Sequence, residues 1–109
     1  MILTRGDTGA YKFTRINASG EPITEAPDAL YFTVKRSFSY SNYVLQKSME
    51  DMTLDSNGTW HFVIEPEDTA TLDYGDYVYD IEVTVSDYVK TISKGKFSIT
   101  EEATWAANK

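Results

Sequence analysis

The sequence contains no cysteine, which excludes disulfide bonds and thiolate metal sites. It contains one histidine, His61, so a metal centre built from several imidazoles is excluded as well. Basic residues are scarce, because 10 lysines and arginines face 17 acids and the net charge is −7. This balance disfavours a general nucleic-acid binder, since such proteins bind by neutralising phosphates. We therefore expect no nucleic-acid partner and no cofactor.

The chain also lacks a long apolar run. A secretory signal needs a continuous apolar stretch, and the segment 1–7 becomes polar within its first four residues. The uncharged stretches elsewhere fall far short of a membrane span. These absences predict a protein that is made in a cytoplasm, without a signal peptide and without a membrane partner.

The overall composition is typical of one globular domain. Hydrophobic residues form 41% and charged residues 25% of the 109 positions. We place the domain at residues 1–102 and a polar C-terminal tail at residues 103–109.

Short strand patterns follow one another along the chain, separated by turn signals. Alternation of apolar and polar residues predicts half-buried strands at 11–16, 30–35, 43–48, 59–64, 76–85 and 88–93. Asn57-Gly58 predicts a tight hairpin turn, and residues 50–52 predict an interruption after the third strand. Pro66 opens a predicted helical turn at 66–72. The apolar parity changes before Phe97, which predicts a β-bulge at Gly95.

About seven short strands at this spacing predict an all-β fold, an immunoglobulin-like antiparallel β-sandwich. Asp73, Gly75 and Tyr77 have the Asp-x-Gly-x-Tyr spacing of a tyrosine corner. In such a corner the tyrosine hydroxyl bonds back to the upstream backbone. Tyr77 as an ordinary core aromatic is the alternative.

Antibody domains carry a disulfide cysteine two positions after the corner tyrosine. This sequence has Tyr79 at that position, so the disulfide is absent. Trp60 or Phe32 would then supply the missing core volume.

Acidic residues concentrate in one part of the chain. The segment 55–89 contains nine acids and no lysine or arginine, and three lysines follow within 90–96. A solvated face with cross-strand pairing to the basic strand is the first interpretation. A docking surface for a basic partner, or a divalent-cation site formed by Asp73, Asp76 and Asp80, are the alternatives.

No catalytic constellation accompanies the single histidine. His61 lies between Trp60 and Phe62 in a predicted strand, and no serine stands in a nucleophile-elbow context. Pairs of acids in so acidic a chain do not by themselves indicate a glycosidase dyad. The tripeptide at 5–7 matches the integrin motif, but Gly6 more simply marks a turn. We therefore expect that the protein is not an enzyme.

Several short signatures along the chain resemble small β-sandwich proteins of tailed bacteriophages and prophages. They are Thr4-Arg5-Gly6-Asp7-Thr8, Phe32-Thr33-Val34-Lys35, Leu45-Gln46-Lys47, Pro66-Glu67-Asp68-Thr69, the segment 72–81, and Thr91-Ile92-x-x-Gly95-x-Phe97-x-Ile99-Thr100. The order of these signatures is similar in particular to the N-terminal domain of phage baseplate upper proteins. The resemblance implies no catalytic residues and a structural role in docking, oligomerisation and holding other virion proteins.

The expected function is that of a non-catalytic virion structural or assembly protein, a tail or baseplate accessory. Its expected partners are other virion proteins and further copies of itself, and its expected location is the virion, after synthesis in the bacterial host cytoplasm. Tyrosine and tryptophan commonly anchor interfaces. The candidate contact residues are Tyr40, Tyr43, Tyr74, Tyr88, Trp105, Asp80 and Glu82. The alternative is a carbohydrate-binding or adhesive β-sandwich module, in which Trp105 and the tyrosines stack on sugar rings.

Overall fold

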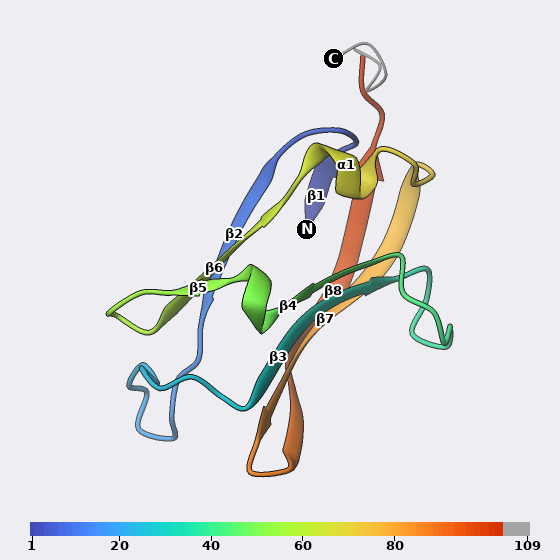
Figure 1. Ribbon diagram of the computed structural model, residues 1–109. Coiled ribbons are helices and arrows are strands. Elements are labelled where there is room, and N and C mark those ends of the chain that lie inside the picture. The colour runs from blue at the N-terminus through green and yellow to red at the C-terminus, as the bar shows by residue number, and fades with distance from the viewer. Residues whose placement is uncertain (104–109) are drawn as a thin grey trace.

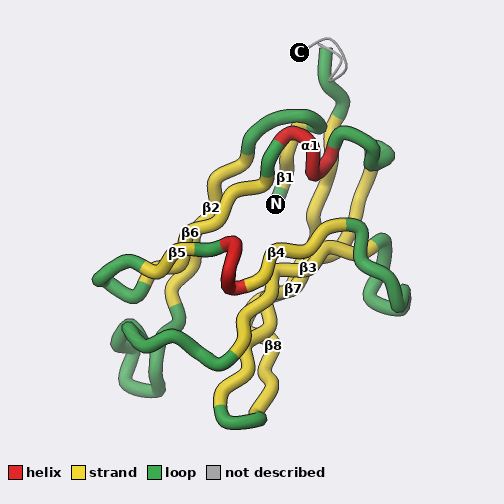
Figure 2. The backbone as a smooth tube through the Cα atoms, in the orientation of Figure 1, coloured by secondary structure: helices red, strands yellow, loops and turns green. Residues whose placement is uncertain are grey.

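The computed structural model describes residues 1–103, which form two β-sheets packed face to face (Figure 1). Strands dominate this part of the chain, and the two helical elements are single turns (Figure 2). The strands are β1 (Ile2–Thr4), β2 (Gly9–Thr14), β3 (Ala29–Lys35), β4 (Leu45–Ser48), β5 (Thr53–Leu54), β6 (Thr59–Ile64), β7 (Gly75–Val85) and β8 (Tyr88–Thr100). The helical turns are η1 (Met49–Asp51) and α1 (Pro66–Thr69).

The larger sheet has the strand order β1-β8-β7-β3-β4, and the smaller has the order β2-β6-β5. All strand pairs are antiparallel except β1 and β8, which run parallel. This is the arrangement of an immunoglobulin-like sandwich, with β7 in the place of strand F and β2 in the place of strand B. The predicted fold class is confirmed.

The core forms where the inner faces of the sheets meet. In β6, Trp60, Phe62 and Ile64 are buried, while His61 points to solvent, because side chains alternate along a strand. The Phe32 side chain in β3 is fully buried, and its ring centroid lies 4.7 Å from that of Phe62. Trp60 and Phe32 thus both fill the interior that has no disulfide, as expected.

The tyrosine corner is present. The Tyr77 side chain is only 3% exposed, and its hydroxyl donates a hydrogen bond of 2.8 Å to the Asp73 carbonyl oxygen. Gly75 lies between them with a φ of +131°, a conformation that side chains rarely adopt. The bond fixes the chain as it passes from α1 into β7.

The structure corrects several predicted boundaries. β1 was not predicted, because three residues are too few to show a period; it is held by parallel pairing with residues 98–100 of β8. β2 begins two residues earlier than expected, and β4 begins at Leu45 rather than at residue 43. The predicted interruption at 50–52 is η1, followed by β5, and these carry the chain from the larger sheet to the smaller one. The helical turn α1 ends at Thr69, short of the expected residue 72.

The predicted bulge lies at a different residue. The register of β7 against β8 shifts at Ile92, because Ile81 faces Ser93 whereas Glu82 faces Thr91. This extra residue, and not Gly95, changes the apolar parity along β8. Gly95 instead lies opposite Tyr79, where an added Cβ would be 3.2 Å from a ring carbon.

Candidate interaction surfaces

The predicted acidic contact residues lie on the outer face of the larger sheet. Asp80 and Glu82 belong to β7, which is paired on one side with β3 and on the other with β8. Asp80 lies directly opposite Lys94, so unlike charges are adjacent on this face. Cross-strand pairing to the basic strand, the first interpretation of the acidic stretch, therefore has structural support.

Asp76, at the beginning of β7, shows the same pairing more directly. Its carboxylate accepts a hydrogen bond of 2.7 Å from the Ser98 hydroxyl and lies 3.5 Å from the Lys96 ammonium. The Ser98 bond first, and the Lys96 charge second, lower the pKa of Asp76 below its ordinary value. Both partners belong to β8, so the acidic and basic strands are matched in register.

The acids proposed as a cation site do not converge. Asp73 forms an ion pair of 3.6 Å with Arg36, while Asp76 is engaged by β8. Within residues 1–103, no group of three or more histidine or acidic side chains is placed to hold a metal ion. The cation alternative therefore has no support from the described residues.

A loop rich in aromatic residues joins β3 to β4, and we call residues 36–44 the aromatic loop. Phe38, Tyr40 and Tyr43 are 56%, 53% and 56% exposed. The Phe38 ring centroid lies 5.9 Å from the Lys94 ammonium, so the loop reaches over the outer face of the larger sheet. The aromatic loop contains two of the predicted contact residues, Tyr40 and Tyr43, and the structure adds Phe38, which the sequence did not single out.

Tyr74 follows Asp73, which forms an ion pair with Arg36, the first residue of the aromatic loop. Arg5 fixes its position: the guanidinium stacks 4.2 Å from the Tyr74 ring centroid and donates a bond of 2.8 Å to its hydroxyl. The same guanidinium also bonds the Leu72 carbonyl oxygen. Gly6 has a φ of +82°, so the tripeptide at 5–7 serves as a turn, as its simpler interpretation predicts.

The remaining predicted contact tyrosine lies elsewhere. Tyr88 is 71% exposed and follows the turn between β7 and β8, at the end of β7 that is opposite Tyr74. The candidate contact residues thus divide between two ends of the sandwich and its outer face. Trp105 lies outside the described residues.

The single histidine belongs to a turn. His61 Nε2 and Asp55 Oδ2 are 2.9 Å apart, and the second oxygen of Asp55 accepts bonds from the amides of Asn57 and Thr59. These bonds, that of His61 foremost, lower the pKa of Asp55. In the described part of the chain, Asp55 is the side chain bonded to His61, so no nucleophile is aligned with the imidazole.

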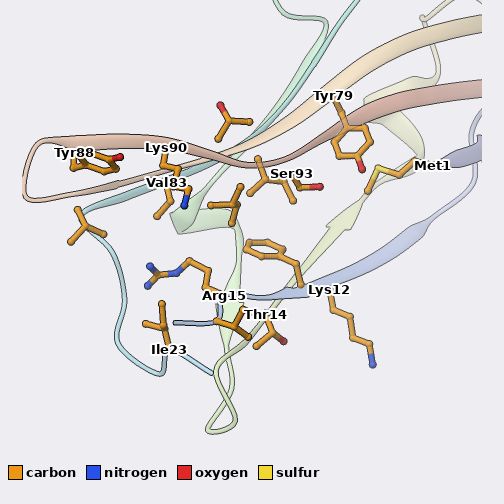
Figure 3. A pocket seen from close by; sticks show the side chains of 16 residues that line it. Met1, Lys12, Thr14, Arg15, Ile23, Tyr79, Val83, Tyr88, Lys90 and Ser93 are labelled. Atoms are coloured by element: carbon orange, nitrogen blue, oxygen red, sulfur yellow. The ribbon is translucent and has the colours of Figure 1, made fainter. Parts of the chain in front are cut away.

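A groove opens between β2 and the β7–β8 hairpin, and the sequence did not predict it (Figure 3). Its volume is about 610 Å³. It arises because β7 and β8 contain 11 and 13 residues, whereas β2 and β6 contain six each. The hairpin therefore extends beyond the smaller sheet, and part of its apolar inner face is uncovered. The long apolar alternation of residues 77–85 was the signal available in the sequence.

No protein-family model matches the chain, and no curated protein sequence matches it. The structure is similar to part of the X-ray structure of the endo-beta-1,4-mannanase from Thermotoga petrophila, with a TM-score of 0.62 and 12% sequence identity. The match covers 93% of this chain but 17% of the enzyme, so this chain corresponds to a small part of that protein. At this identity the similarity concerns the fold alone. None of the helices in residues 1–103 has the length and apolarity needed to cross a membrane.

Proposed function

We propose that the protein is a non-catalytic structural or assembly component of a tailed phage or prophage virion, a tail or baseplate accessory that acts through protein–protein contacts. The aromatic loop carries this proposal. Three large rings that are more than half exposed stand within six residues of one another on a single loop. Aromatic side chains are enriched at interfaces because they bury a large area at a small cost in conformational entropy. The motif resemblance to phage β-sandwich proteins supplies the setting.

The surroundings of the loop favour a contact surface. Tyr74 is held in place by Arg5, so its ring is ordered before any partner binds. Pre-organised side chains lose less entropy on binding and therefore contribute more to affinity. The loop and Tyr74 would each supply an anchor of the interface, and the half-buried charges Asp80 and Glu82 lie on the outer face of the same sheet.

The first test is to purify particles of the phage or induced prophage that encodes the protein, and to search the separated head and tail fractions by mass spectrometry. We expect the chain in the tail fraction. In a complementation assay, Tyr40→Ser combined with Tyr43→Ser should lower its incorporation by about tenfold or more, since interface aromatics often contribute over 1.4 kcal/mol. Ser41→Ala in the same loop is the matched control and should be incorporated normally. Absence of the chain from purified particles contradicts the proposal.

Self-association is tested separately by light scattering at low and high salt. We expect an assembled form, and weakening by salt would implicate the charged outer face. A monomer at all concentrations, together with equal incorporation of the tyrosine variant and wild type, would rule out the aromatic loop as the interface.

The second candidate function, a carbohydrate-binding or adhesive module, rests on the same exposed rings. Phe38, Tyr40 and Tyr43 could stack on sugar rings instead of on a protein. A glycan array distinguishes the two functions. Binding that is lost in the Tyr40→Ser, Tyr43→Ser variant favours the carbohydrate function, and silence on the array removes it.

A further inference from the structure

We propose that the groove between β2 and the β7–β8 hairpin binds an extended acidic segment of a partner protein, which adds a strand to the outer edge of β2. This inference rests on the proposed function in protein–protein contact and names the chemistry of one partner. It concerns a surface remote from the aromatic loop.

The outer edge of β2 has no strand beside it. β2 pairs with β6 on one side through six consecutive residues in regular register, and no strand among residues 1–103 pairs with its other side. An unpaired edge presents a row of amide and carbonyl groups that a second chain can bond. A segment of six residues in extended form would match its length of about 20 Å.

β8, at the other border of the groove, is less suited than β2 to accept an added strand. β1 covers β8 only at residues 98–100, so residues 88–95 also lack a neighbour on that side within the described chain. However, this stretch contains the bulge at Ile92. A bulge interrupts the regular row of amide and carbonyl groups that strand addition needs. The regular edge of β2 is therefore where the partner strand pairs.

The floor and mouth of the groove are apolar. Ile81 and Val83 of β7 line it from the core side, and Phe13 of β2 lies across from them. At the mouth, Ile16 is 63% exposed and Val85 is 43% exposed. Alternate side chains of a strand paired to β2 would point into this space, at intervals of about 7 Å. The partner segment should therefore carry an apolar residue at every second position.

The charge of the groove lining indicates which polar residues the partner segment should carry. Arg15 and Lys90 bring positive charge to the groove and no acid lines it, although the whole chain carries a net charge of −7; Lys12 borders the groove, but its ammonium group points away from it (Figure 3). Figure 3 shows Lys90 and Arg15 on opposite walls. One Arg15 nitrogen donates to the Glu25 carbonyl oxygen at 2.7 Å, while its buried Nε has no partner among the described residues. A carboxylate on the bound segment would pair with the Arg15 guanidinium and the Lys90 ammonium, so the polar positions of the segment should include aspartate or glutamate.

A second copy of this chain does not fit the groove as well. Among its strands, only β7 carries acidic residues (Asp76, Asp80 and Glu82), and β7 is already paired on both sides by β3 and β8. The charge and topology thus favour a different protein as the occupant.

The test begins with a display library of random peptides of about 12 residues, twice the length of β2, selected on the immobilised full chain. We expect enrichment of peptides that alternate apolar residues with aspartate or glutamate. An enriched peptide is then synthesised, and its affinity is measured by fluorescence polarisation. Lys90→Glu and Arg15→Glu should each weaken binding by about tenfold or more, and added salt should weaken it further. Lys35→Glu in β3, which makes the same charge change away from the groove, is the matched control.

Hydrogen exchange locates the bound peptide. Amides of residues 9–14 that face away from β6 should gain protection, while those of the aromatic loop should not. The inference is overturned if no enriched peptide distinguishes Lys90→Glu from Lys35→Glu, or if protection appears on β8 or the aromatic loop instead. It is also overturned if the chain forms a dimer that Lys90→Glu dissociates, since a second copy would then occupy the groove. If the protein is found in virions but no peptide binds through the groove, this inference is refuted and the proposed function stands. If peptides bind through the groove but the protein is absent from virions, only the virion assignment is refuted.

Discussion

Tyr77→Phe removes one hydroxyl group and tests whether the tyrosine corner stabilises the fold. The hydroxyl lies 2.8 Å from the Asp73 carbonyl oxygen, and the Tyr77 ring is 3% exposed. A hydrogen bond of this kind contributes about 1 kcal/mol to stability. Because Asp73 lies in an exposed segment, water can take over its carbonyl group in the variant, so the full penalty for an unpaired buried group does not apply. We therefore expect a loss of roughly 0.5–1.5 kcal/mol.

Urea unfolding followed by Trp60 fluorescence measures this loss, since the Trp60 side chain is 3% exposed in the folded protein. With an m-value of about 1–3 kcal/mol/M, a change of about 1 kcal/mol lowers the midpoint by roughly 0.3–1 M. The melting temperature should fall by about 4–8 °C per kcal/mol.

Tyr79→Phe is the matched control for this measurement. It makes the same chemical change two residues away on β7, and no hydrogen bond of the Tyr79 hydroxyl occurs among the described residues. We expect a change within about 0.5 kcal/mol, as for substitutions that break no specific interaction. If Tyr77→Phe and Tyr79→Phe destabilise the protein equally, the corner bond does not contribute to stability.

Three further predictions concern the β5–β6 hairpin and the core. In urea unfolding, Gly58→Ala should lower stability by roughly 1–2 kcal/mol more than Gly20→Ala. Both glycines have a φ near +80°, but of these two only at Gly58 would the added Cβ approach a backbone carbonyl oxygen, at 2.8 Å. Equal losses of stability would show that the backbone conformation, and not this contact, causes the effect. Trp60→Phe should cost far less than the roughly 3–5 kcal/mol of Trp60→Ala, because phenylalanine keeps an aromatic ring in the buried site whereas alanine leaves a large cavity. Both variants remove the indole N–H that is buried without a partner, so this donor does not separate them; calorimetry of both variants checks the order. The pKa of Asp55 is lower in the folded state, so its ionised carboxylate stabilises the fold at a pH above the ordinary aspartate pKa of 3.8. This contribution is lost as the pH falls through the lower pKa of the folded state. In an NMR titration of the Asp55 carboxyl group, His61→Phe should raise that pKa, since the His61 bond is its largest cause; an unchanged midpoint would contradict this.

The sequence allowed the elements that depend on local pattern to be predicted. Alternation in residues 59–64 identified β6 and its inward residues Trp60, Phe62 and Ile64, because burial on one face imposes a period of two. The Asp-x-Gly-x-Tyr spacing predicted the hydrogen bond of Tyr77, since all its partners lie within five residues. Strand count and turn spacing were sufficient for the fold class.

The candidate surfaces were only partly predictable. The sequence identified the exposed tyrosines of the aromatic loop by residue type, but not the ion pair between Arg36 and Asp73 that joins the start of this loop to the segment before β7. It also did not reveal that Arg5, 69 residues from Tyr74, holds that ring in place. Such contacts join segments that are distant in the chain, and no local period encodes them.

By itself, the sequence determined an acidic, cysteine-free β-sandwich with a tyrosine corner, because composition, alternation and turn chemistry act over a few neighbouring residues. Only the tertiary structure decided the parallel pairing of β1, the position of the bulge at Ile92, and the groove beside β2. The groove exists because strands of unequal length are stacked, so that the β7–β8 hairpin extends past the smaller sheet. That mismatch depends on which strands become neighbours in space, and it places Arg15 and Lys90 around one apolar opening in an otherwise acidic protein.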